Sequence, residues 1–394
     1  MGILWTDKID IEGKKGWYGC GEINGIFEID FDTNKYKYLT SFDDCGENTI
    51  RTYSICKKYK NKLFCFPVYG DKIWIYHIEE KIFSKIDDPS FFDSDYLLMY
   101  EPFVYNHFLY VLSRKKCAVV EIDPEQECMH SVISIPKEIG AVGSNCIQDG
   151  NKLYCSSIDK GVLCQIDLDT KQIKLYEIPY MEKGINTISM ESADKFWLSG
   201  RDKQICIWDK QSQKSIILTD FPEEFGIYRD IDGKLEIDYE EKVSEDFLFV
   251  GTVNIENHIW FIPYRSNKIL YVDKDTHKIS VLEISDEQEC VDGWKRYLTH
   301  KYLINYIREN RYIGLYSTKN GYLFEIDAKE LTVQKRDLIL DKKSISKFIS
   351  DFAGVPVMIR EDVSNLKKMF WLLSKQNIDT KETSIGEKIY HITT

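Results

Sequence analysis

The sequence predicts an all-β protein built from seven repeated units, each a four-stranded antiparallel sheet. The first observation behind this prediction is a run of short apolar strands separated by polar turns, clearest over residues 257–284. The second is an acidic residue that closes one strand in nearly every unit. The third is a small or ring-restricted residue ten positions before it. A hydrophobic content of 43% and an aromatic content of 13% favour a well-packed globular chain.

The acidic residue sets the length of the repeat. It occurs as Asp30, Asp123, Asp167, Asp209, Asp273 and Asp327, and His77 takes the same position in the second unit. Successive positions are separated by 47, 46, 44, 42, 64 and 54 residues. Units of roughly 40–50 residues made only of strands are typical of β-propeller blades. We therefore count seven blades and interpret the two longer gaps as insertions.

The two repeated positions also predict local structure. The small or ring-restricted residues are Cys20, Pro67, Ser113, Ser157, Ser199, Pro263 and Ser317. Such residues suit a strand end that enters a turn, where neither bulk nor a free amide is needed. A polar turn follows each acidic residue, so we expect its carboxylate to form an Asx turn.

An inner strand precedes these elements in each unit. We place the inner strands near residues 3–11, 50–57, 98–105, 145–149, 187–191, 249–255 and 302–308. Their alternation of apolar and polar residues is imperfect, as expected for strands buried on both faces between neighbouring blades. Four tryptophans on the blade strands are predicted to lie in the core: Trp74, Trp197, Trp208 and Trp260.

Two segments depart from the repeat. An acidic insertion at about residues 220–247 accounts for the longest gap. After the propeller, which we assign to residues 1–340, a tail spans residues 341–394. It shows helical patterns at 344–352 and 364–376, and residues 388–392 could form a final strand.

The chain resembles the β-propeller superfamily over about residues 3–340. Its turns EIDFDT and QIDLDT are similar to those of bacterial propellers, which include lyases, carbohydrate binders and scaffolds. Ile207-Trp208-Asp209 resembles the WD dipeptide, but it occurs once and no GH pair precedes it. The resemblance implies that the long loops between blades and the turns between second and third strands share one face, the usual binding surface around an axial channel.

The turns of that face carry a repeated cationic position, eight residues before the closing residue of the blade. It is occupied by Lys115, Arg201, Arg265 and Lys319, and Arg114 precedes the first of them. An arc of such side chains could hold a carboxylate or phosphate. Lys and Arg are also common in exposed turns and could pair with the acidic insertion, so both interpretations stay open. Trp294, in a long loop, offers a flat face for stacking.

Catalytic and metal-binding patterns are sparse. His300 lies near Glu289 and Asp292 in a long loop, and such a pair could act as a general base, as in propeller lyases. The 11 cysteines are scattered and form no CxxC pair, so neither a zinc site nor a redox dithiol is predicted. We expect no metal and no cofactor.

Charge and hydropathy narrow the function further. A net charge of −12 argues against nucleic-acid binding, which needs a basic face. No apolar stretch approaches the ~20 residues of a membrane span, and the chain begins without a secretory leader, so we expect a cytoplasmic protein. The leading hypothesis is a non-catalytic binding or scaffold propeller that recognises an acidic small molecule, glycan or peptide, or a protein partner. The alternative is a lyase or hydrolase with a His–carboxylate pair near the channel.

Overall fold

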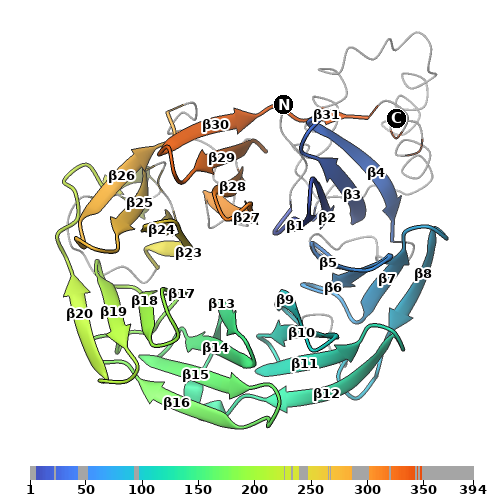
Figure 1. Ribbon diagram of the computed structural model, residues 1–394, viewed down its shortest axis with the longest axis horizontal. Coiled ribbons are helices and arrows are strands. Elements are labelled where there is room, and N and C mark those ends of the chain that lie inside the picture. The colour runs from blue at the N-terminus through green and yellow to red at the C-terminus, as the bar shows by residue number, and fades with distance from the viewer. Residues whose placement is uncertain are drawn as a thin grey trace.

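Seven four-stranded antiparallel sheets stand around a common axis, as Figure 1 shows. The computed structural model describes residues 6–21, 24–42, 52–92, 97–225, 227–231, 234–238, 247–264, 266, 268–285, 301–318, 321–341, 344 and 347. Each blade takes its four strands from one continuous stretch of chain. The predicted seven-bladed β-propeller is confirmed.

The strands fall into four rings, from the axis outward. The innermost strands are β1 (Asp10–Glu12), β5 (Ile55–Tyr59), β9 (Met99–Tyr105), β13 (Val142–Asp149), β17 (Thr187–Met190), β23 (Phe249–Ile255) and β27 (Tyr302–Arg308). The second strands are β2 (Lys15–Gly19), β6 (Lys62–Phe66), β10 (Phe108–Ser113), β14 (Lys152–Ser157), β18 (Lys195–Ser199), β24 (His258–Pro263) and β28 (Tyr312–Ser317). The third strands are β3 (Gly25–Asp30), β7 (Ile73–His77), β11 (Ala118–Asp123), β15 (Val162–Asp167), β19 (Ile205–Asp209), β25 (Lys268–Asp273) and β29 (Leu323–Asp327). The outer strands are β4 (Lys35–Ser41), β8 (Ile82–Ile86), β12 (Cys128–Ser134), β16 (Ile173–Glu177), β20 (Lys214–Leu218), β26 (Ile279–Glu283) and β30 (Thr332–Arg336).

Among the described residues, a 3-10 turn, a hairpin and a short strand lie between or after the blades. A single 3-10 turn, η1 (Lys137–Ile139), connects blades 3 and 4. A hairpin of β21 (Ile227–Ile231) and β22 (Lys234–Asp238) forms within the acidic insertion. A two-residue strand, β31 (Ile339–Leu340), follows blade 7. The helical patterns and final strand expected in the tail lie outside the described residues, apart from Ser344 and Lys347.

The turns after the third strands form as the sequence predicts. Asp273 Oδ1 accepts hydrogen bonds from the amides of Asp275 (3.1 Å) and Thr276 (2.8 Å). The amide of Thr276 is the main reason that the pKa of Asp273 lies below its ordinary value. Equivalent carboxylate-to-amide bonds occur at Asp30, Asp123, Asp167, Asp209 and Asp327. The repeated acid therefore holds a turn, on the face opposite the long loops.

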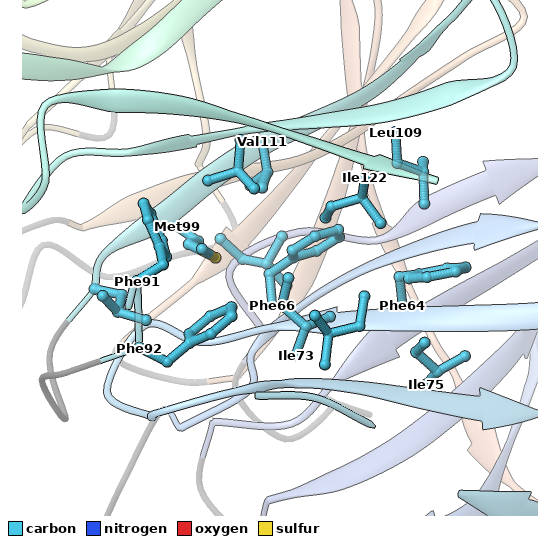
Figure 2. Packing of buried hydrophobic residues seen from close by; sticks show 14 of the residues in the cluster. Phe64, Phe66, Ile73, Ile75, Phe91, Phe92, Met99, Leu109, Val111 and Ile122 are labelled. Carbon is cyan, nitrogen blue, oxygen red and sulfur yellow. The ribbon is translucent and has the colours of Figure 1, made fainter. Parts of the chain in front are cut away.

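The apolar core lies mostly between blades and not within them. In Figure 2, Phe64 and Phe66 of blade 2 face Leu109 and Val111 of blade 3. Further clusters of this kind join other neighbouring blades around the ring. This arrangement explains why the blade strands are apolar on both faces.

The ring closes between blades 7 and 1 without sharing a blade. The amide of Ile9 donates to Asn305 O (2.7 Å), and the Asn305 side chain donates to Thr6 O (3.0 Å). Beyond blade 7, β31 crosses to blade 1 and pairs in parallel with β4, aligning Leu340 with Tyr36. Because β31 is a fifth strand on a complete sheet, it acts as a strap over the joint (Figure 1).

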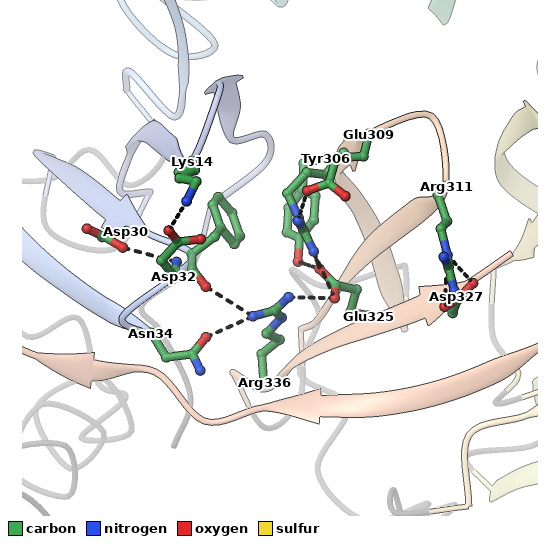
Figure 3. Close-up of polar contacts among 12 residues, drawn as sticks. Lys14, Asp30, Asp32, Asn34, Tyr306, Glu309, Arg311, Glu325, Asp327 and Arg336 are labelled. Carbon is green, nitrogen blue, oxygen red and sulfur yellow. Dashed lines mark hydrogen bonds and ion pairs between the residues drawn. The ribbon is translucent and has the colours of Figure 1, made fainter. Parts of the chain in front are cut away.

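Polar side chains reinforce the same joint. The carboxylate of Glu325, on β29, is fully buried and accepts hydrogen bonds from Tyr306, Arg308, Gln334 and Arg336. Figure 3 shows Arg336 reaching onward from this carboxylate to Asn34 of blade 1. One buried charge thus organises three strands of blade 7 and ties them to blade 1.

Candidate functional site

The long-loop face is made of the turns between second and third strands and the loops that lead from one blade to the next. In blades 3 and 4, a serine at the end of the second strand fastens the turn. Ser157 is fully buried; its hydroxyl donates to Ile139 O and accepts from the amides of Asp159 (3.3 Å) and Lys160 (3.1 Å). In blade 3, Ser113 donates in the same way to Leu97 O (2.9 Å). The serine therefore holds both its own turn and the incoming loop.

We expect Ser157→Ala to lower the free energy of unfolding by about 1–3 kcal/mol, because it leaves the buried carbonyl of Ile139 without its donor. The measurement is urea denaturation followed by far-ultraviolet circular dichroism. Ser90→Ala is the matched control: Ser90 is exposed, and its loss is expected to change stability by less than about 0.5 kcal/mol. A Ser157 variant as stable as the Ser90 variant would contradict this role.

Two of the predicted cationic residues lie together in blade 3. Arg114 donates its Nε–H to Val142 O (2.8 Å), and its guanidinium lies over the ring of Tyr100. Arg114 therefore bridges blades 3 and 4, a structural task that the sequence did not predict. Lys115, next in the chain, is exposed.

Arg201, the third predicted cation, occupies the corresponding turn of blade 5. Its guanidinium carbon lies 4.2 Å from the centre of the Phe247 ring, at the end of the acidic insertion. Stacking on a ring leaves the edge of the guanidinium free to form a bidentate pair. Within the described part of the chain, no carboxylate forms an ion pair with Arg201.

The described part of the arc is interrupted in blade 4. Its turn carries Asp159 at the cationic position, and that carboxylate accepts the amide of Ala141 (2.8 Å). In blade 5, Asp202 beside Arg201 pairs instead with Lys183 (2.6 Å). Cationic positions in blades 3 and 5 are therefore separated by an acidic one.

The other candidate residues remain predictions. Arg265, Lys319 and Trp294, and the proposed catalytic group of Glu289, Asp292 and His300, lie outside the described residues. Nothing in the structure tests their grouping.

A charged pair near the ring axis was not predicted from sequence. Lys8, just before β1, pairs with Glu101 of β9, although blade 2 lies between their blades. Glu101 has a φ of 49° in a β-bulge of β9 and precedes Pro102; bulges of this kind redirect side chains. Burial acts to lower the pKa of Lys8, but the Glu101 carboxylate outweighs it and the pKa is raised. Lys8 is therefore a charged ammonium at neutral pH.

Among the described residues, no group of three or more His, Cys, Asp or Glu side chains is arranged to hold a metal ion. No helix within the described ranges is long and apolar enough to cross a membrane.

Comparison with known proteins identifies the fold and nothing narrower. No family model matches the chain, and no curated protein matches it. A chain of the mitotic checkpoint complex is similar in structure, with a TM-score of 0.52 at 10% identity, over 81% of this chain and 86% of that one. The computationally designed Ika8 protein is similar with a TM-score of 0.51 at 10% identity, over 86% of this chain and 90% of the design. At such identity, these likenesses concern the fold alone.

Proposed function

We propose that this propeller is a non-catalytic binding module that holds an acidic ligand on its long-loop face. The observation that carries the proposal is Arg201, which stacks on Phe247 and has no carboxylate partner among the described residues. A guanidinium held in this way is suited to a carboxylate or phosphate, which it can bind through two parallel hydrogen bonds. Lys115, exposed at the same repeat position two blades away, adds positive charge to the same face.

The fold suits this role. Loops and turns form the face, while buried serines and the apolar clusters between blades fix the strands beneath it. Binding residues carried on loops above a rigid framework are the common arrangement in proteins. The acidic ligand would be a small molecule, a glycan or a peptide segment, and a propeller that binds peptides would act as a scaffold.

A thermal-shift screen tests the proposal. The full chain is heated with sugar acids, sugar phosphates, nucleotides and acidic peptides, since a ligand at 100 times its Kd adds about 2.7 kcal/mol to stability. We expect one class to raise the Tm of the wild type and to lose this effect in Arg201→Ala. Lys329→Ala is the matched control, because Lys329 is an exposed cation on the opposite face. A stabilising ligand that is unaffected by Arg201→Ala, or a screen with no stabilising ligand, would contradict the anion site.

A further inference from the structure

Two blades carry the same pair of cysteines. Cys56 lies directly opposite Cys65 in blade 2, and Cys146 lies directly opposite Cys155 in blade 4. In each blade the two cysteines stand 21 and 12 positions before the residue that closes the third strand. Each pair therefore joins an innermost strand to the second strand at one and the same place in the repeat.

The geometry of both pairs suits a disulfide. Directly opposed residues of an antiparallel pair have Cα atoms about 4.5–5.5 Å apart, within the range of about 4.4–6.8 Å that a disulfide tolerates. In blade 2 the two sulfur atoms lie 3.1 Å apart. In blade 4 the strand register places Cys146 and Cys155 opposite each other in the same way. Either pair can therefore be joined with little movement of the backbone.

The two cysteine pairs differ in their exposure to solvent. Cys56 and Cys65 are buried, with exposed fractions of 1% and 0%. Cys155 is also fully buried, but Cys146, on the innermost strand β13, is partly exposed. Figure 1 places β13 at the inner edge of its blade, toward the ring axis. Of these four cysteines, Cys146 is therefore the one with appreciable contact with solvent.

The surroundings of the blade 4 pair assign different roles to its two sulfurs. The neighbouring Cys146 side chain, together with burial, holds the pKa of the Cys155 thiol well above its ordinary value. Cys155 therefore keeps its proton, and Cys146, the partly exposed residue of the pair, is the one that a peroxide meets first. The Lys8 ammonium lies within electrostatic range of Cys146, although Glu101 shares its charge.

We propose that Cys146 and Cys155 form a peroxide-sensitive dithiol, with Cys146 as the attacking sulfur and Cys155 as the resolving one. The Cys146 thiolate attacks one peroxide oxygen; the O–O bond breaks, the sulfur becomes a sulfenic acid, and the other oxygen leaves as water or an alcohol after taking up a proton. Cys155 then attacks the sulfenic sulfur, its proton and the hydroxyl leave as water, and an S–S bond forms. Two thiols lose two electrons in total, and the hydroperoxide accepts them.

The sequence analysis predicted no redox dithiol, because no CxxC pair occurs. The cysteines of each pair are nine residues apart, because a β-hairpin and not a helical turn brings them together. The proposal is independent of the anion site on the long-loop face.

The test compares the two pairs within one wild-type molecule. The full chain is treated with hydrogen peroxide, quenched with N-ethylmaleimide at intervals, digested without reduction and mapped by mass spectrometry. We expect the Cys146–Cys155 disulfide to form on the order of tenfold faster than Cys56–Cys65, since thiol oxidation follows exposure and thiolate character. Equal rates for the two pairs, or failure of Cys146–Cys155 to form, would overturn the proposal.

Variants then test the two roles. In Cys155→Ser, oxidation is expected to stop at a Cys146 sulfenic acid that dimedone traps, whereas Cys65→Ser, its counterpart in blade 2, should leave formation of Cys146–Cys155 unchanged. Absence of the dimedone adduct in Cys155→Ser would contradict Cys146 as the attacking sulfur. Because the wild-type mapping needs no variant, a folding defect in either variant does not remove the test.

Discussion

Glu325→Ala is expected to lower the free energy of unfolding by about 3–5 kcal/mol, the usual cost of removing one partner of a buried ion pair. Its carboxylate has no exposed surface, and the side chains of Arg308 and Arg336 are only 13% and 14% exposed. The Arg336 pair spans 2.7 Å and the Arg308 pair 3.3 Å. Without Glu325, two guanidinium groups would stay buried beside an unpartnered Tyr306 hydroxyl.

Urea denaturation monitored by far-ultraviolet circular dichroism measures this loss. Glu330→Ala is the control, because Glu330 is 60% exposed and lies 3.7 Å from Arg311, and exposed pairs contribute about 0–1 kcal/mol. Equal losses in the two variants would show that the buried network does not hold the joint between blades 7 and 1.

The dependence of stability on pH gives a second test of the role of Glu325. Burial acts to raise its pKa, but the hydrogen bond and charge of Arg336, with that of Arg308, leave the pKa below its ordinary value. A lowered pKa in the folded state contributes stability above the ordinary glutamate value of about 4.3, and this stability is lost as pH falls through the folded-state pKa. The difference in free energy of unfolding between wild type and Glu325→Gln should therefore shrink as pH falls below about 4.3.

The sequence predicted the blades well where turn signals bracket a strand. The inner strands expected at 249–255 and 302–308 match β23 and β27 residue for residue. By contrast, β5 begins at Ile55 and not at 50, and β1 begins at Asp10 and not at 3. Thr52 and Tyr53 are residue types that favour strands. Thr52 instead accepts the amide of Val68 at its carbonyl and donates its own amide to Asn24 Oδ1, bracing the turns of blades 1 and 2.

The way in which blades 7 and 1 join could not be predicted from the sequence. A parallel strand of two residues, β31, has no periodicity to recognise, and the partners of Glu325 come from two other strands of blade 7, β27 and β30. A charged residue inside an apolar strand was visible at this position, but nothing in its neighbours indicated that two arginines would meet it.

The candidate site was predicted only in outline. The repeat showed which residues lie in equivalent turns. It did not show where each side chain points, because the repeat determines the position of the turn but not the path of each side chain. Arg114 donates one hydrogen bond to Val142 O. Ser157, at the end of a second strand, is not only small but also forms a hydrogen bond to the incoming loop. Such contacts join segments about 20–30 residues apart, and spacing alone does not show where a side chain will find its acceptor.

Among substitutions of apolar core residues, we expect the largest effect from Trp208→Ala. It should lower the free energy of unfolding by about 3–5 kcal/mol. Trp208 is fully buried between blades 4 and 5, with its ring 5.3 Å from Tyr176 and 5.6 Å from Phe196, centre to centre. It resembles the tryptophan of a WD dipeptide in sequence, yet its surroundings make it a core residue, as predicted for the strand tryptophans. Trp197 and Trp260 are likewise fully buried, whereas Trp74 is partly exposed.

Trp208→Phe separates packing from hydrogen bonding. The indole Nε1 of Trp208 has no hydrogen-bond partner among the described residues. Phenylalanine at this position removes that unsatisfied buried donor and still places an aromatic ring between the blades. We therefore expect Trp208→Phe to cost less than half as much as Trp208→Ala in the same urea denaturation. If both variants lost the same free energy, the indole would have a partner and the stability of this joint would not come from apolar packing. If Trp208→Ala cost less than about 1 kcal/mol, the blades would be able to close over the cavity, contrary to the rigid packing expected of a ring core.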